Sequence, residues 1–600
     1  MSAPKLVRNG DNTEVVTEQP AVTCATVSTQ PSLQDLDRSL HSALASFTGG
    51  LAPAALAGAF FDWYAHLLSS PGKQLELMLG VADRGGIESC ASAPRRPDAD
   101  RRPSDPIEGD ARFRAPQWNA EPFNLFAKNF LSVEKWWDAA TTGVRGVSKQ
   151  HEAMARFVAR QILDTMAPSN FVLTNPQVLE RTLATGGQNL RRGFSNFLED
   201  ASRALTRGVP AESEPFQVGK TVAITPGKVV HRTKLAEIIQ YAPATAEVRP
   251  EPIVIVPAWI MKYYILDLSQ QNSLVKYLTE QGFTVFMISW KNPGGEDRDV
   301  GFDDYRKEGV LAAIDAATQI TKSRKVHAVG YCLGGTLLAV AAAAMARDGD
   351  DRLASISMLA AQTDFSEAGE LKLFINESQI AFLEDMMWER GYLDSSQMAG
   401  AFRLLRSNDL IWSRLVHDYL MGERSAPMDI MAWNADATRM PYRMHSEYLR
   451  ALFLDNALAE GRFLVDCRPI TVHDLHVPVF AVSTEKDHVA PWRSVFKLHL
   501  LANVDLTFVL TSGGHNVGIV APPAGGGQHY RVARHSRKDR YVDPDTWLRE
   551  NQVRPGSWWI AWVQWLTARS GPPGAPPPLG LAGTAFAPLQ DAPGTYVLMK

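Results

Sequence analysis

The spacing of apolar residues along the chain changes its period near residue 216. Between residues 118 and 205 the apolar positions recur at helical spacing and include many aromatic side chains. Beyond residue 216 they gather in short runs, several of them uninterrupted, as in strands that are covered on both faces. These runs predict strands at residues 221–224, 228–231, 236–241, 253–256, 283–288, 326–329, 356–359, 479–482 and 506–510. Helical segments such as 273–281 and 303–322 lie between most of the runs, which favours a mostly parallel sheet.

The same pattern divides the chain into segments. Residues 33–82 have helical periodicity, with Leu36, Leu40, Leu44 and Phe47 on one face. The strand–helix alternation stops between about 364 and 467, where a helical insertion rich in Met, Trp and Tyr is expected to form a cap. The predicted segments are a disordered N-terminus (1–32), a helical N-terminal region (33–82), a Pro/Arg-rich linker (83–117), a helical N-terminal domain (118–215), a catalytic domain (216–570) and a Pro-rich C-terminal tail (571–600).

Composition narrows the class of protein. The chain has 600 residues, more than one ordinary domain, and 45% of them are hydrophobic, enough for a large core. A net charge of −4 gives no reason to expect nucleic acid as a partner. The four cysteines are too few for a disulfide framework, and the polar N-terminus has no signal-peptide pattern, so we expect a cytoplasmic protein. Residues 43–68 are the most apolar stretch, but they are interrupted by polar residues and predict a buried or interfacial helix, with no transmembrane segment.

The most specific motif is Gly330-Tyr331-Cys332-Leu333-Gly334, between an apolar run and an Ala-rich helical segment. A glycine-flanked nucleophile at a strand-to-helix turn resembles the nucleophile elbow of the α/β-hydrolase fold. We therefore predict an α/β protein of the α/β-hydrolase fold, with a helical cap insertion and a mainly helical N-terminal domain in front. Cys332 takes the nucleophile position, where the N-terminus of a helix favours the thiolate.

A thiolate nucleophile needs a base and a group that orients the base. In this fold the order along the chain is nucleophile, acid, histidine, which selects Asp487 and His515 after two consecutive predicted strands. His488 is either a supporting group or only a neighbour of Asp487. For the oxyanion hole we expect the backbone N–H of Leu333 and a second N–H from residues 257–260, with Trp259 as first choice.

The choice of cysteine points to acyl transfer. Attack of a thiolate on a thioester produces another thioester, so the acyl group stays activated for a second acceptor. No cofactor or metal is expected, because the chain has no P-loop, no dinucleotide-binding fingerprint and no zinc-like histidine spacing. A basic stretch that includes His529, Arg531, His535 and Arg540 is expected to be a solvated face, with phosphate binding as the other reading.

From about residue 33 to its end, the chain resembles the polyhydroxyalkanoate synthases, the bacterial polyester polymerases. The elbow alone would not identify the family, but several further segments match it. The matching segments are Pro168-Ser169-Asn170-Phe171, Thr174-Asn175-Pro176, the run 262–268, Ser289-Trp290-Lys291-Asn292-Pro293, the run 330–338, Trp433-Asn434-Ala435-Asp436, Glu485-Lys486-Asp487-His488 and Gly514-His515-Asn516. The region 33–80 and the ending 592–596 are similar to those of single-subunit members that use short acyl units.

The resemblance implies an acyltransferase that polymerises (R)-3-hydroxyacyl-CoA, most of all 3-hydroxybutyryl-CoA, and releases coenzyme A. Cys332 would carry the acyl group, and His515 would be the base that activates Cys332. In the family, the acid at the position of Asp487 is often assigned to activating the substrate 3-hydroxyl, so its role is open between that and orienting His515. Trp433 falls in a motif near the site or the dimer contact. The family also implies a homodimer on the surface of polyester granules.

Two other functions fit parts of the pattern. A cysteine-dependent thioesterase or hydrolase would use the same elbow and triad. A non-catalytic granule-coat or scaffold protein would use the apolar N-terminal helices and the Trp-rich helix near Trp558 for adsorption. The intact order of Cys, Asp and His argues against the second alternative.

Overall fold

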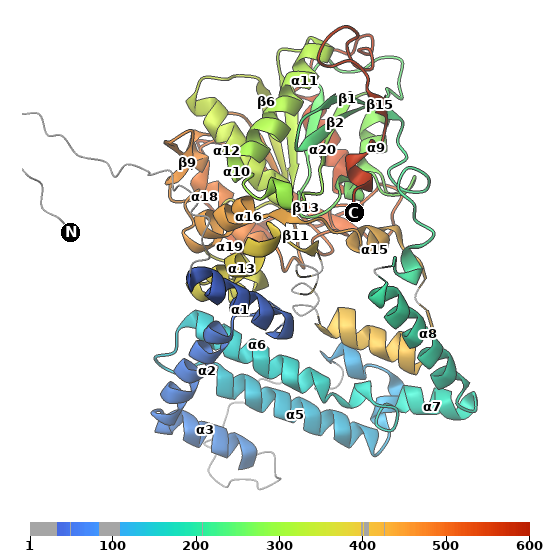
Figure 1. The fold of residues 1–600 in the computed structure, drawn as a ribbon, viewed down its shortest axis with the longest axis vertical. Helices are drawn as coiled ribbons and strands as arrows, with labels where there is room; N and C mark the ends of the chain where they lie inside the picture. Colours follow the sequence, from blue (N-terminus) through green and yellow to red (C-terminus); the bar gives the residue numbers. More distant parts are fainter. Residues whose placement is uncertain are drawn as a thin grey trace, which may run out of the picture.

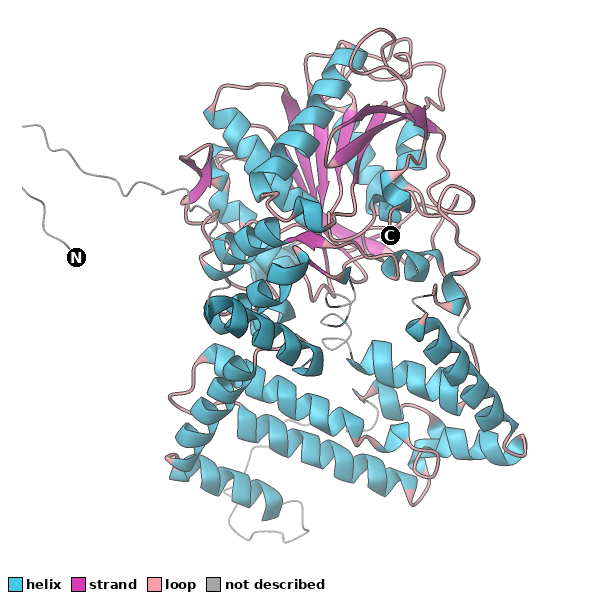
Figure 2. Ribbon diagram, viewed as in Figure 1, coloured by secondary structure: helices cyan, strands magenta, loops and turns pink. Residues whose placement is uncertain are grey.

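The structure is a computed structural model that describes residues 33–48, 50–82, 109–206, 208–395, 397, 400, 407–424 and 426–600. The segment 1–32 and most of 83–117 lie outside these residues, as do Cys24 and Cys90. All the strands lie in one half of the molecule, and a layer of N-terminal helices covers one end of that half (Figures 1 and 2).

A large mixed sheet forms the frame of the catalytic domain. Among the described residues its strand order is β14-β13-β12-β11-β6-β5-β3-β4-β2-β1-β15. The strands from β4 to β12 across its middle are parallel, and the outer strands are antiparallel. The strands are β1 (Gly227–Arg232), β2 (Ala236–Tyr241), β3 (Ile253–Val256), β4 (Val285–Trp290), β5 (Val326–Tyr331), β6 (Leu353–Leu359), β11 (Val479–Thr484), β12 (Leu506–Thr511), β13 (His529–His535), β14 (Arg554–Pro555) and β15 (Gln590–Asp591).

Both faces of this sheet are covered, which explains the uninterrupted apolar runs. In β3, Val254 and Val256 pack into one core cluster, whereas Ile253 and Ile255 pack into the other. The first cluster holds α11 and α12, and the second holds α9 and the tryptophans of α20. The helices of the catalytic domain are α9 (Leu274–Glu280), α10 (Phe302–Tyr305), α11 (Ala312–Thr321), α12 (Leu333–Arg347), α17 (Trp492–Phe496), α18 (Leu498–Leu501), α19 (Pro544–Glu550) and α20 (Trp558–Thr567).

Eight of the nine predicted strands form, and two predictions at the sheet are wrong or incomplete. Residues 221–224 form no strand; the chain makes only an isolated bridge between Val218 and Val222. The basic stretch was not predicted to be a strand, yet it forms most of β13. Its charged residues are accommodated because β13 lies near the edge of the sheet, where Arg531 pairs with Glu485 and Arg534 with Asp505.

The N-terminal layer is helical, as its periodicity predicts. Its helices are α1 (Leu33–Thr48), α2 (Pro53–Leu68), α3 (Pro71–Ala82), α5 (Phe123–Thr141), α6 (Lys149–Thr165), α7 (Pro176–Ala184) and α8 (Gln188–Leu205). The end of the predicted linker at residue 117 lies too late, because Phe113 is buried against Trp118 and Phe130. Arg112 beside it is paired with Glu134 and Asp164. The last part of the linker therefore belongs to the folded layer.

The insertion at 364–467 is mainly helical and connects the two halves. Its elements are η9 (Glu370–Phe374), α13 (Glu377–Arg390), β7 (Tyr392–Leu393), η10 (Asn408–Trp412), η11 (Leu415–Leu420), α15 (Asp429–Asn434), β8 (Met440–Pro441), α16 (Tyr442–Tyr448), η12 (Leu449–Leu454) and β9 (Phe463–Val465), followed by β10 (Arg468–Ile470). Helix α13 packs on α1, and η11 packs on α8. The insertion therefore lies between the sheet and the N-terminal layer (Figure 1).

The Pro-rich tail is part of the sheet domain. Strand β15 pairs with β1, and the fully buried carboxylate of Glu237 accepts hydrogen bonds from the backbone N–H groups of Thr595 and Tyr596. Lys262 donates to the carbonyl of Met599 at 2.7 Å. These contacts fasten the C-terminal residues to β1, to β2 and to the loop that follows β3.

Several apolar side chains of the N-terminal layer are exposed. Leu36 and Leu40 on the predicted face of α1 are 68% and 58% exposed, and Phe60 and Phe61 of α2 are 58% and 72% exposed. None of the described helices is both long enough and apolar enough to cross a membrane. Exposed apolar side chains of this kind are suited to contact with another apolar surface.

Candidate active site

The candidate nucleophile lies at a strained strand-to-helix turn. Cys332 follows β5 and caps α12 with φ 53° and ψ −126°, a conformation that side chains other than glycine rarely adopt. The turn needs close backbone approach on both sides. A Cβ atom on Gly334 would lie 2.1 Å from the carbonyl oxygen of Val256, and one on Gly335 would lie 2.3 Å from Cβ of Ala361. The glycines thus let α12 begin directly behind Cys332, a residue that is only 8% exposed.

His515 and Asp487 form a hydrogen-bonded pair next to this turn. Nδ1 of His515 lies 2.8 Å from Oδ2 of Asp487, and the carboxylate side chain is fully buried. The other oxygen, Oδ1, accepts the N–H groups of Val489 and Ala490 at 2.9 and 2.8 Å. One carboxylate oxygen is thus fixed by backbone, and the other is aimed at the imidazole. This arrangement fixes the orientation of the His515 ring, with Nδ1 turned toward Asp487.

The surroundings of His515 favour its protonated form. Burial by itself lowers the pKa of His515, but the charges of Asp487 and Cys332 and its hydrogen bonds to both raise that pKa well above the ordinary value. The thiol, the imidazole and the carboxylate therefore interact as one group. They come from three different strand ends, after β5, β11 and β12, which meet at the same edge of the sheet.

Of the two residues expected to supply oxyanion donors, Leu333 lines the cavity together with Cys332 and Trp259 does not. Leu333 is the first residue of α12, so its N–H is one of those that a helix leaves without an intrahelical partner. Trp259 is buried among Phe302, Tyr305 and Tyr448, away from the cavity, whereas Ile260 lines the cavity together with Cys332. Ile260 is the next residue after Trp259, so the loop that was expected to supply the second donor reaches the cavity wall.

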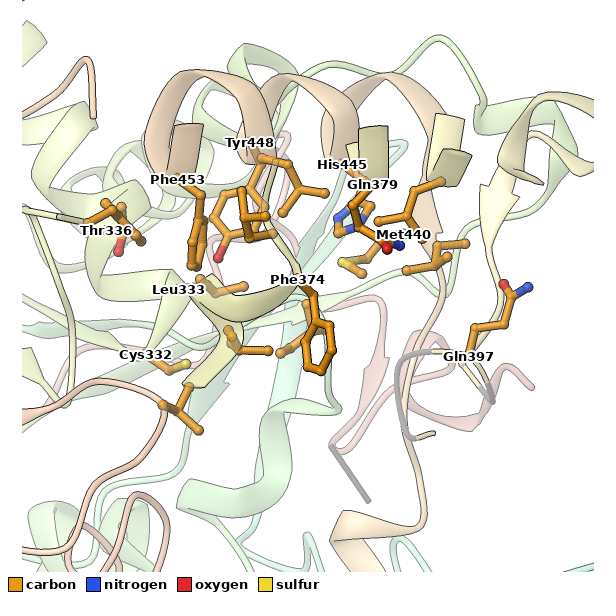
Figure 3. Close-up of a pocket in the computed structure, with 18 of the residues that line it drawn as sticks. Cys332, Leu333, Thr336, Phe374, Gln379, Gln397, Met440, His445, Tyr448 and Phe453 are labelled. Atoms are coloured by element: carbon orange, nitrogen blue, oxygen red, sulfur yellow. The ribbon is translucent and has the colours of Figure 1, made fainter. Parts of the chain in front are cut away.

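A cavity of about 140 Å³ opens in front of Cys332. Its walls are mostly apolar and come from α12, from the loops after β3, β6 and β11, and from the cap. Figure 3 shows Cys332 on one side, Tyr448 and Phe374 beyond it, and Gln379 and Gln397 towards the other side. A ligand with an apolar body fits this cavity with its reactive end at Sγ of Cys332.

A few polar groups interrupt this apolar lining. Oε1 of Gln362 and Nδ1 of His445 are buried without a hydrogen-bond partner. Burial lowers the pKa of His445 to about 4, so its ring is neutral. Burial and then the nearby charge of Cys332 raise the pKa of Tyr448 well above its ordinary value, so its hydroxyl keeps its proton. Donors and acceptors of this kind suit a ligand that carries carbonyl or hydroxyl groups.

Sequence reasoning missed two residues that hold the site together. The hydroxyl of Tyr331 donates to Oδ1 of Asn516 at 2.6 Å, and the Tyr331 ring lies 5.7 Å from the His515 ring. This bond joins the residue before the nucleophile to the residue after the base. Tyr331 and Asn516 belong to the same two motifs as Cys332 and His515. The sequence does not indicate that residues of two separate motifs bond to each other, because only the fold brings them together.

The remaining predicted residues lie around the site. His488 is exposed, and its backbone carbonyl accepts the N–H of Glu370, which favours its being only a neighbour of Asp487. Trp433 is buried and donates its indole N–H to the carbonyl of Lys262 at 2.7 Å, so it ties the cap to the loop after β3. Among the described residues, Trp433 makes no hydrogen bond to Cys332 or to His515.

One acidic cluster lies far from this site. Asp200, Glu212 and Asp418 place carboxylate oxygens close together where α8 meets η11. Arg414 and Arg424 pair with Asp200 and Glu212 there, so the charges are largely compensated by protein. The cluster reads as an ion-pair network between the N-terminal layer and the cap.

The sheet order, the strained elbow and the paired His515 and Asp487 define an α/β-hydrolase-fold protein whose nucleophile position holds a cysteine. Family comparison agrees with this class. Residues 251–522 match the model of the alpha/beta hydrolase fold, residues 109–278 match the poly-beta-hydroxybutyrate polymerase (PhaC) N-terminus, and residues 31–73 match the poly-beta-hydroxybutyrate polymerase N terminal model.

Curated relatives extend the match over most of the chain. The poly(3-hydroxyalkanoate) polymerase of Methylorubrum extorquens is 42% identical over 501 residues, which cover 82% of this chain and 82% of the relative. The polymerase subunits PhaC of Rhizobium etli and Cupriavidus necator are 37% and 33% identical, over 86% and 82% of this chain and 80% and 83% of the relatives. The chain belongs to the poly(3-hydroxyalkanoate) polymerase family, and the prediction of an acyltransferase-type enzyme is confirmed.

Proposed function

We propose that this enzyme polymerises (R)-3-hydroxyacyl-CoA, with 3-hydroxybutyryl-CoA as the preferred substrate, through an acyl thioester on Cys332. The observation that carries the proposal is that the buried Cys332 lines an apolar cavity at the elbow, beside His515. Burial by itself lowers the pKa of His515, but the charges of Asp487 and Cys332 raise that pKa well above its ordinary value. A thiolate, a proton donor and an acyl-binding wall are the parts that thioester exchange requires.

The first half-reaction is acylation. The Cys332 thiolate attacks the thioester carbonyl of the substrate, and the developing oxyanion is stabilised by the N–H groups of Leu333 and Ile260. The bond between the carbonyl carbon and the coenzyme A sulfur then breaks. Coenzyme A leaves as a thiol after it takes the proton from His515, and the acyl group is held on Cys332.

The second half-reaction is elongation. The 3-hydroxyl of another unit attacks the thioester on Cys332, and His515 takes the hydroxyl proton as an ester forms and the thiolate is released. Asp487 acts by orienting His515. Its side chain is fully buried, is held by two backbone N–H groups and does not line the cavity, so it would have to leave these partners to reach a substrate hydroxyl.

Purified enzyme supplied with 3-hydroxybutyryl-CoA tests the proposal directly. We expect free coenzyme A and insoluble polyester from the native enzyme, and neither from Cys332→Ala, because no other group at the elbow can carry the acyl chain. Cys467→Ala is the matched control, since that cysteine is exposed in the turn between β9 and β10. Polymer formation by Cys332→Ala would overturn the proposal.

The hydrolase alternative predicts a different product. A thioesterase would release free 3-hydroxy acid in equal amount to coenzyme A and leave no precipitate. A non-catalytic coat protein would release no coenzyme A at all. A single reaction followed by thiol release, by acid titration and by turbidity therefore separates the three functions.

We further propose that the enzyme works as a homodimer at the granule surface in the cytoplasm. The exposed leucines of α1 and the exposed phenylalanines of α2 supply an apolar surface in the N-terminal layer for such contacts. Light scattering of the purified enzyme tests the dimer, and cosedimentation with polyester particles tests the granule contact. Replacing Phe60 and Phe61 with Ser should weaken cosedimentation; unchanged cosedimentation would remove this surface from the proposal.

A further inference from the structure

The cavity in front of Cys332 has an end wall that comes from outside the catalytic domain. Gly50 and Leu51, in the turn between α1 and α2, line the cavity together with Cys332. Gln379 lines it too, and Figure 3 shows Gln379 and Gln397 on the side away from Cys332. The N-terminal turn therefore meets the cavity at the end opposite the nucleophile.

A single buried amide holds this turn in place. Gln379 of α13 is 4% exposed, donates its Nε2 to the carbonyl of Gly50 at 2.7 Å and accepts the N–H of Ala52 on Oε1 at 2.8 Å. Both ends of its amide are thus used on one turn. Gly50 has φ 85°, which suits glycine, so the turn has a defined backbone shape that presents Leu51 to the cavity.

The turn is also part of the main core. Ala45, Ala52 and Ala55 are buried in the same cluster as residues of β3 and α12. Nearby, Nδ1 of His41 lies 2.6 Å from the Asp385 carboxylate of α13. The corner between α1 and α2 is thus packed against the catalytic domain as an integral wall.

We infer that the turn formed by Gly50, Leu51 and Ala52 is the end wall of the acyl-binding cavity and sets the longest acyl chain that the enzyme accepts. The inference rests on the proposed function for the identity of the acyl group. An apolar wall limits chain length in a simple way. Each methylene buried strengthens binding by about fourfold, and the first methylene that meets the wall reverses this gain.

Two changes at Leu51 should move the limit in opposite directions. Leu51→Ala lengthens the cavity, and Leu51→Phe shortens it. Gln379→Ala frees the turn and should act like Leu51→Ala. Gln150→Ala is the matched control: its amide also joins the N-terminal layer to the cap, by donating to the carbonyl of Ile375 at 2.7 Å, but it leaves the turn between α1 and α2 untouched.

The first readout does not need the polymerase reaction. Straight-chain alkyl methanethiosulfonates transfer an S-alkyl group to the Cys332 thiolate and release methanesulfinate, so the rate of labelling reports the chain length that fits. Labelling is followed at Cys332 by peptide mass spectrometry in a variant with Cys24, Cys90 and Cys467 changed to Ser. We expect Leu51→Ala to raise labelling by the first excluded probe about tenfold or more, and Leu51→Phe to lower it for shorter probes.

The second readout is coenzyme A release from 3-hydroxyacyl-CoA substrates of increasing length. The ratio of kcat/KM for a long to a short substrate should rise about tenfold or more in Leu51→Ala and Gln379→Ala, and stay unchanged in Gln150→Ala. Equal length profiles for the two Leu51 variants, in either readout, would overturn the inference. So would a Gln150→Ala profile that shifts as much as that of Gln379→Ala. If probe labelling shifts as expected but no coenzyme A is released, the proposed function is overturned, whereas the inference that this turn limits chain length is retained.

Discussion

At the scale of single residues, the proton on His515 links the structure to the reaction. The charge of Asp487 is one of the causes that raise the pKa of His515 against the opposing effect of burial. A raised pKa means that the imidazolium persists to higher pH, where it can still donate a proton to the departing thiolate. The alkaline limb of the activity profile should therefore reflect this proton.

Asp487→Asn should move that limb to lower pH. The amide keeps the size of the side chain but removes its charge, so the pKa of His515 falls and the imidazolium is lost earlier as pH rises. We expect kcat/KM for acylation to fall by about 10²–10⁴-fold as well, because His515 is held less well for proton transfer. The profile is measured by coenzyme A release between pH 6 and about 10. An unshifted alkaline limb would mean that Asp487 does not set the proton affinity of His515.

The bond between Tyr331 and Asn516 gives a second prediction at this scale. Tyr331→Phe keeps the ring beside His515 and removes the 2.6 Å hydrogen bond. We expect kcat to fall about fivefold to tenfold, since a neutral hydrogen bond contributes about 1 kcal/mol, with KM little changed because Tyr331 does not line the cavity.

Asn516→Ala should add no further loss in the Tyr331→Phe background, because both changes remove the same bond. Tyr419→Phe is the control, since its hydroxyl bonds to Asp200 at the distant ion-pair network. Additive losses from the two site changes would show that Tyr331 and Asn516 act independently.

At the scale of elements, the junction of β5, α12 and the loop after β3 decides whether the elbow can form. Gly334→Ala would place a Cβ atom 2.1 Å from the carbonyl of Val256, and that backbone cannot rotate away. We expect a loss of about 1–3 kcal/mol in the free energy of unfolding and a larger loss of activity, because the displaced backbone leads to Ile260.

Gly574→Ala is the matched control, because nothing lies within 4 Å of the added Cβ. Its stability should change by no more than about 0.5 kcal/mol. Urea unfolding and coenzyme A release on both variants check the pair. Native stability and activity for Gly334→Ala would show that the loop after β3 yields more readily than its packing indicates.

Elements of the sheet were predictable to different degrees for a physical reason. Inner strands such as β3 and β11 are covered on both faces, so their composition alone marks them. Strand β13 lies near the edge, where its arginines reach acidic partners and solvent, and its sequence resembles a solvated face. Two-residue strands such as β15 exist only because a neighbouring strand offers hydrogen bonds.

At the scale of the whole molecule, the buried His327 and His445 and the half-buried His499 should make stability depend on pH. Burial lowers the pKa of His327, His445 and His499 to about 4 each. The unfolded chain binds a proton at each of them near pH 6.5, whereas the folded chain does so only near pH 4. Stability should therefore fall as pH drops through this window, by about 1.4 kcal/mol per pH unit for each histidine.

His499→Phe tests this at a position outside the cavity. The new ring can keep the 4.0 Å stacking on Phe496, and the slope of stability against pH should lose the contribution of one proton. The exposed His476→Gln serves as the control and should leave the slope unchanged. Thermal unfolding at pH 5, 6 and 7 measures the stability of both variants, because these pH values span the range in which histidine side chains titrate. Equal slopes in His499→Phe and the native enzyme would contradict the assignment.

Local patterns in the amino-acid sequence were enough for the α/β-hydrolase fold, for the elbow at Cys332 and for the choice of Asp487 and His515, because strand periodicity, turn glycines and the order of motifs are short-range properties. The partnership of Tyr331 with Asn516, the docking of the tail on Glu237 and the wall that Leu51 adds to the cavity were decided by tertiary packing. Each joins residues that are more than a hundred positions apart, and no local pattern records which distant surfaces will meet when the hydrophobic core closes.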